Sequence, residues 1–111
     1  MSSGYNEADL SAPARNVHRA LASVQEELEA IDYYHQRADR TDDPQLKAIL
    51  EHNRDEEVEH ATMLLEWLRR HMPQFDVAMK TYLFTSKPVV EIEKALEAAA
   101  SNELRVGNLK G

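Results

Sequence analysis

The chain has 111 residues and no cysteine, so it is expected to form one small domain without disulfides. Twenty acidic against thirteen basic residues give a net charge of −7, which argues against a nucleic-acid partner because phosphate binding needs a basic surface. No apolar run approaches the ~18 residues of a membrane span, and the first residues do not resemble a signal peptide. We therefore expect a cytoplasmic protein that binds neither nucleic acid nor membrane.

Few glycines and prolines favour an all-α fold, and the first two helices can be placed along the chain. Residues 1–10 are expected to be a flexible leader. The first helix should start near Ser11 or Ala12 and run to a turn at residues 40–44, where Asp43 is the expected N-cap and Pro44 the first residue of the second helix. Pro73 should end the second helix. Each helix is then ~40 Å long, and such a hairpin cannot cover its own apolar faces, so we expect self-association.

Both helices carry an apolar stripe with alternating steps of three and four residues. The stripe of the first helix consists of Val17, Leu21, Val24, Leu28, Ile31, His35 and Ala38. The stripe of the second helix consists of Leu50, Asn53, Glu57, His60, Leu64 and Trp67.

Beyond Pro73 the pattern predicts helical pieces at about residues 75–84 and 90–100, either as one bent helix or as two. The helical domain is expected over residues 11–97. Residues 98–111 would then be a linker followed by a short apolar segment, Leu104–Leu109.

Glu57 and His60 stand out because two metal-ligand residue types occupy the centre of an apolar stripe. Residues at i and i+3 lie on one face of a helix. A carboxylate buried there without a partner costs several kcal/mol or has a shifted pKa, and a bound cation would remove that cost. Glu-x-x-His is also the ligand element of di-iron carboxylate bundles, which use it twice, with one more Glu from each of two other helices.

Glu27 is predicted to lie beside this pair. It precedes Asp42, at the turn, by as many residues as Glu57 follows it, so both are roughly 22 Å from the turn. Two carboxylates and one imidazole suit iron or manganese, and a twofold dimer would double the set into a di-iron centre. Oxidation of Fe(II) by O₂ is the chemistry most expected there. Tyr34 could serve as a hydrogen-bond donor beside the ligands.

With these residues in view, the chain resembles the encapsulated ferritins over nearly its whole length. The most specific stretches are residues 26–34, EELEAIDYY, and residues 52–60, HNRDEEVEH. The resemblance implies a ferritin-like half-bundle of two long antiparallel helices and a shorter C-terminal helix. It also implies a ferroxidase centre shared across a homodimer, which completes a four-helix core, and dimers assembled into a ring-shaped homodecamer.

Residue by residue, the resemblance implies that Glu27, Glu57 and His60 are iron ligands and that Tyr34 is the tyrosine beside them. Glu26 and Glu29 match acids near the entrance of the centre, where other divalent cations can bind. Tyr33 stands where family members can carry Trp, which affects the control of metal access more than the centre.

The tail is similar to the peptide by which cargo docks inside an encapsulin shell, through Leu104, Val106, Gly107 and Leu109. Spaced aliphatic residues and a glycine on a flexible tether suit insertion into an apolar groove, with order gained only on binding. The resemblance therefore implies that the protein works inside an encapsulin nanocompartment, where the shell stores the iron that this protein oxidises.

Two other functions remain open from the sequence. The hairpin could be a non-catalytic assembly or adaptor module, or a di-metal peroxide scavenger of the rubrerythrin sort. The absence of cysteine excludes a rubredoxin-type iron site but leaves peroxide chemistry open.

Overall fold

The protein is all-helical in the part of the chain that the computed structural model describes, which is residues 7–110, with side chains for residues 7–103. The 3₁₀ helix η1 (Glu7–Asp9) precedes four α-helices: α1 (Ala12–Arg40), α2 (Pro44–His71), α3 (Pro73–Tyr82) and α4 (Val89–Lys110). One compact unit ends at Pro73 and the other begins at Gln74, and each is described by itself. The prediction of an all-α fold is confirmed.

The ends of α1 and α2 follow from their capping residues. The Ser11 hydroxyl accepts a hydrogen bond from the amide of Ala14 at 3.3 Å, and Pro13 is tolerated in the first turn. The Asp43 carboxylate accepts from the amides of Gln45 and Leu46 at 2.9 and 3.3 Å, with Pro44 as the first residue of α2. These caps satisfy backbone N–H groups that the helix itself leaves unpaired, and the predicted helix starts are confirmed.

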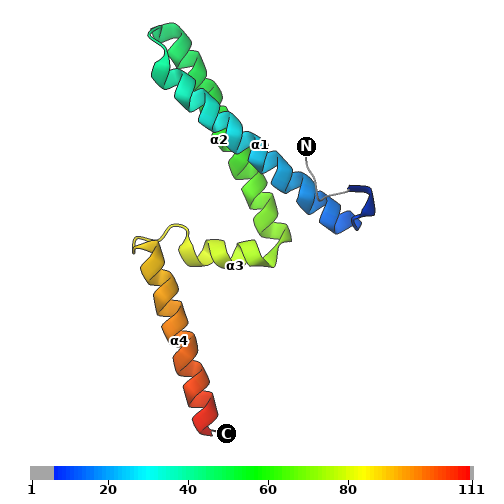
Figure 1. Cartoon of the computed structure of the whole chain (residues 1–111), viewed down its shortest axis with the longest axis vertical. Coiled ribbons are helices and arrows are strands. Elements are labelled where there is room, and N and C mark those ends of the chain that lie inside the picture. The colour runs from blue at the N-terminus through cyan, green and yellow to red at the C-terminus, as the bar shows by residue number, and fades with distance from the viewer. Residues whose placement is uncertain (1–6, 111) are drawn as a thin grey trace. The chain divides into compact units, whose positions relative to one another are not determined.

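Helices α1 and α2 lie side by side as a long antiparallel hairpin (Figure 1). Its buried residues are mostly small: Ala20, Val24, Ala38, Ala61 and Leu68. Because small side chains lie at the seam, the two backbones can approach closely along their length. This geometry places side chains that flank the seam of one helix beside those of the other.

The predicted stripe of α1 is only partly correct. Val24 and Ala38 are buried, but Leu21 and Leu28 are 36% and 53% exposed, while Ala20 is buried instead. The apolar stripe is broader than the seam, so the smallest residues occupy the contact and the larger leucines are displaced to its side. Further exposed apolar residues on the hairpin are Leu46, Ile49, Val58 and Met63. The predicted self-association would cover such surface, and it stays a prediction.

The start of the chain differs from the flexible leader expected over residues 1–10. Residues 1–6 lie outside the described part. Residues 7–9 form η1, which is held against α1 because the Arg15 side chain donates to the carbonyls of Glu7 and Leu10 at 3.0 and 3.1 Å. Arg19 forms an ion pair with the Glu7 carboxylate.

The second unit holds α3 and α4 as two separate helices, which resolves the alternative left open by the sequence. Between them Phe84 has a φ of 61°, the left-handed conformation that usually follows a helix end, and it is a costly conformation for a residue other than glycine. The Thr85 hydroxyl donates to the Tyr82 carbonyl at 2.7 Å.

Helix α4 continues well beyond the expected end near Ala100, so the predicted linker from residue 98 is helical in the structure. The run Ala98–Ala100 explains part of the difference, because alanine is the strongest helix former. The side chains of the predicted docking residues Leu104, Val106 and Leu109, and Gly107 between them, lie outside the described part.

Among the described helices, none combines the length and the apolar character needed to cross a membrane.

Leu68 is the one side chain among the described residues that the hairpin buries completely, at 0% exposure. We expect Leu68→Ala to lower the free energy of unfolding by about 2–5 kcal/mol through lost burial and a cavity. Urea unfolding measures this change in the free energy of unfolding. All samples need the same protein concentration, because association adds to stability. The exposed Lys47 on the same helix is the control: Lys47→Ala should change stability by under about 0.5 kcal/mol. Equal losses in both variants would contradict this packing.

Candidate metal centre

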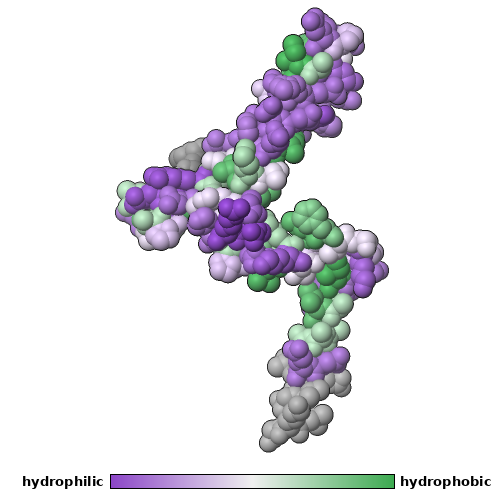
Figure 2. All heavy atoms as spheres, turned by 180° about the vertical axis from the view of Figure 1, so that it is seen from behind, coloured by the Kyte–Doolittle hydropathy of each residue, from purple (hydrophilic) through white to green (hydrophobic). Residues whose placement is uncertain are grey.

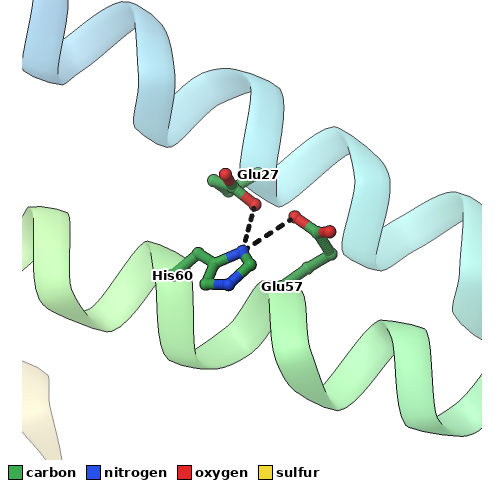
Figure 3. Close-up of side chains that lie close together, drawn as sticks. All are labelled: Glu27, Glu57 and His60. Atoms are coloured by element: carbon green, nitrogen blue, oxygen red, sulfur yellow. Dashed lines mark ion pairs between the residues drawn. The ribbon is translucent and has the colours of Figure 1, made fainter.

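Glu27 from α1 and Glu57 and His60 from α2 point toward one another between the two helices (Figure 3). Each offers one ligand atom, and these atoms all lie within 4.8 Å of one another. The Nδ1 atom of His60 lies 3.7 Å from Oε2 of Glu27 and 3.6 Å from Oε2 of Glu57. The structure thus brings together the three residues that counting from the turn had placed at one level. Their role as metal ligands stays a prediction.

The two carboxylates are largely withdrawn from solvent, with side chains 23% and 25% exposed for Glu27 and Glu57. Among the described residues, the Oε2 atom of Glu27 is a buried side-chain oxygen without a hydrogen-bond partner. Nδ1 of His60, 3.7 Å away, is beyond hydrogen-bond distance. A carboxylate oxygen buried in this way is unfavourable unless a cation or donor approaches it. The site therefore suits a cation placed between the three side chains.

The donor set fits iron or manganese. Carboxylate oxygen and imidazole nitrogen are the ligands that these divalent ions accept in helix bundles. Ligand atoms on one ion at bond lengths of ~2.1 Å are at most ~4.2 Å apart, so small rotations of the side chains would close the present spacing around an ion. Three protein ligands leave further coordination positions open.

Tyr34, predicted to donate a hydrogen bond beside the ligands, is half-buried on α1. Its ring contacts Arg37, whose guanidinium carbon lies 5.6 Å from the ring centroid. The same guanidinium lies 5.8 Å from the ring of Tyr33. A hydrogen bond from Tyr34 to the ligands stays a prediction.

Glu26 and Glu29, the acids predicted near an entrance, are exposed on α1 and are not part of the three-residue group. The Tyr33 hydroxyl donates a hydrogen bond to the Glu29 carboxylate at 2.9 Å. This bond, followed by the negative charge of Glu29, raises the pKa of Tyr33 above its usual value. This pairing was not predicted from the sequence, although the spacing of four residues on one helix is a signal for it.

An all-α hairpin that presents two Glu and one His from adjacent helices has the architecture of ferritin-like proteins. The sequence profile of the EncFtn-like family matches residues 4–86. The chain belongs to this family, and the resemblance to encapsulated ferritins is confirmed.

Relatives of known name are similar over most of the chain. A "Ferritin-like protein" of Thermotoga maritima is 52% identical over 104 residues, covering 92% of this chain and 91% of that protein. An "Encapsulated ferritin-like protein" of Rhodospirillum rubrum is 48% identical over 110 residues, covering 86% of this chain and 79% of that protein. The solved structure of protein ne0167 from Nitrosomonas europaea is 54% identical, with a TM-score of 0.76, and covers 80% of this chain and 98% of that one.

Glu27→Gln should remove the stabilisation of the fold by metal without destabilising the metal-free protein. Without metal we expect the variant to unfold at the same or a higher temperature than the wild type, because a buried charge without a hydrogen bond is replaced by a neutral amide. With Mn(II) or anaerobic Fe(II) the wild type should gain stability by mass action, about 2.7 kcal/mol at a hundredfold excess over Kd, and the variant should gain little. Thermal unfolding with and without metal measures this, with Asp39→Asn, an exposed acid on the same helix and outside the three-residue group, as the control. An unchanged metal-induced gain in Glu27→Gln would contradict a role for this carboxylate.

Glu29→Gln should lower the pKa of Tyr33 toward its ordinary value, because the negative charge that disfavours the phenolate is gone. Ultraviolet difference titration at alkaline pH, with Tyr33→Phe to identify the signal, measures the shift. Glu26→Gln, one turn before Glu29 on the same helix, should leave the pKa of Tyr33 unchanged. A Tyr33 pKa insensitive to Glu29 would mean that the hydrogen bond does not persist in solution.

Proposed function

We propose that this protein is a ferroxidase that oxidises Fe(II) to Fe(III) with O₂ at a di-iron centre shared between two chains. The observation that supports it most directly is the convergence of Glu27, Glu57 and His60 around a buried oxygen of Glu27 that has no hydrogen-bond partner among the described residues. Membership of the EncFtn-like family supports iron rather than another cation as substrate.

The residues divide the work at the centre by their chemistry. The carboxylates of Glu27 and Glu57 would hold the ion and bring negative charge close to it, which favours Fe(III) over Fe(II). His60 would bind the ion through an unprotonated ring nitrogen, so it would add no charge to the centre. Fe(II) is the substrate here: two ions would give up one electron each, and one O₂ would accept both electrons with two protons from solvent to give H₂O₂. Tyr34 on α1 would hold a ligand or a proton beside the centre.

One hairpin supplies three ligands, which is half of a di-iron set. A twofold homodimer would place a second Glu27, Glu57 and His60 opposite the first, and it would also cover exposed apolar residues of the hairpin. We propose that such dimers assemble into a ring-shaped decamer. Dimerisation is then a condition of activity.

We further propose that the protein works as cargo inside an encapsulin nanocompartment and that the shell stores the oxidised iron. The relative in Rhodospirillum rubrum is named encapsulated. A protein of Myxococcus xanthus, 35% identical over 81 residues, is named "Encapsulin nanocompartment cargo protein EncC", and the match covers 73% of this chain and 57% of that protein. The segment Leu104–Leu109 would be the docking peptide.

Purified protein should oxidise Fe(II) in air well above the buffer blank. Glu27→Ala and His60→Ala should each lose at least tenfold in initial rate, because each removes a ligand from both halves of the centre. Absorbance of Fe(III) against time measures the rate, with peroxide tested as a second oxidant. His52→Ala, on the same helix but outside the group, is the control. The ferroxidase proposal fails if the wild type matches the blank or if the ligand variants match the wild type.

A further inference from the structure

Helix α4 carries an apolar stripe on one face of its described part. Val89, Ile92, Leu96 and Ala99 follow one another at steps of three and four residues, so they share a face of the helix. We name these four residues the α4 stripe. Val89 is 58% exposed and Leu96 is 50% exposed, whereas Ile92 is half-buried. Figure 2 shows hydrophobic surface gathered over the turn before α4 and over its first turns.

The surface is concave at this point. A hollow of about 800 Å³ is lined by Ile92 and Leu96 together with Thr81 and Phe84 from the end of α3 and the following turn. Phe84 is fully exposed in its left-handed backbone conformation. An apolar side chain of a partner could insert here.

Acidic residues border the stripe on both sides. Glu91 and Glu93 lie next to Ile92 along the chain and flank it around the helix, and Glu97 follows Leu96. A groove that accepts the stripe therefore needs an apolar floor and a basic rim.

The stripe is short for pairing with a second α4. Its four positions span two heptads, and the next position in the repeat is Glu103. Coiled coils are expected only where apolar heptads continue for three or four repeats. A preformed groove can hold so short a stripe, because a rigid partner pays less of the ordering cost.

Two further facts favour the shell over another copy of the chain as the occupant. The EncFtn-like profile ends at residue 86, so α4 lies beyond the family domain that holds the candidate metal centre. The backbone of α4 continues as one helix to Lys110, through the segment proposed to dock. The stripe and the docking segment thus belong to one element.

We propose that the α4 stripe is an interaction surface for the encapsulin shell, bound as a helix in an apolar groove with a basic rim. This inference rests on the proposed shell docking and extends it upstream, from residues 104–109 to the start of α4. Docking then involves the first turns of α4 in addition to the terminal segment. Two linked contacts also raise the overall affinity through effective concentration.

The test is loading of full-length protein into the encapsulin shell protein from the same organism. Wild type and each variant are produced separately with the shell, so that they cannot form mixed oligomers, and the ratio of cargo to shell in purified shells is measured by mass spectrometry. Leu96→Glu should be loaded at least fivefold less than the wild type. Ser101→Glu, with the same charge change on the face away from Ile92, should stay within twofold, and Leu96→Met should load normally.

Three controls separate the possible failures. Deletion of residues 104–111 should remove loading, and if it does not, the proposed docking itself is wrong. If the deletion abolishes loading but Leu96→Glu loads like Ser101→Glu, docking stands and the α4 stripe has no part in it. Native mass and circular dichroism of the free variants should equal those of the wild type, and a changed oligomer in Leu96→Glu would assign the stripe to contacts between copies instead.

Discussion

The Glu27 carboxylate lies between two long helices with one oxygen buried and without a hydrogen-bond partner among the described residues. Nδ1 of His60 lies at ion-pair distance from this oxygen and from Oε2 of Glu57, but at hydrogen-bond distance from neither. Burying this charge is unfavourable in the absence of a cation, and a helix that only had to pack would place an apolar residue there. The rest of the hairpin serves this arrangement. Small residues at the seam bring α1 and α2 close, and caps at Ser11 and Asp43 set where each helix starts and hence which residues share a level.

The hairpin is also incomplete as a core. It fully buries Leu68 and covers mainly alanine and valine besides, while leucines and an isoleucine stay exposed beside the seam. Exposed apolar surface of this kind indicates an interaction site. Under the proposed function, the same chain would supply only half of a di-iron ligand set. One partner related by a twofold axis would remedy both deficits, which is why dimerisation and chemistry are linked in this account.

The sequence predicted the hairpin well because its signals are local: N-caps, prolines at helix starts and the spacing of apolar residues. The level of Glu27 against Glu57 followed from helix rise alone. Which residues form the seam could not be derived from the sequence in this way. Leu21 and Ala20 are neighbours, and only the close approach of the two helices decides that the alanine is buried. The Tyr33–Glu29 hydrogen bond and the length of α4 were missed for a similar reason. Each depends on weak local preferences, such as rotamer choice and the run Ala98–Ala100, that the stripe pattern does not encode.

We propose that the centre exists only where two chains meet. Native mass spectrometry of metal-free protein titrated with anaerobic Fe(II) tests this by assigning bound iron to each oligomeric species. We expect iron on dimers and larger assemblies in multiples of two per dimer, with monomers carrying none. Stoichiometric iron on monomers, lost in Glu27→Ala and His60→Ala, would show a complete site within one hairpin and contradict the shared centre.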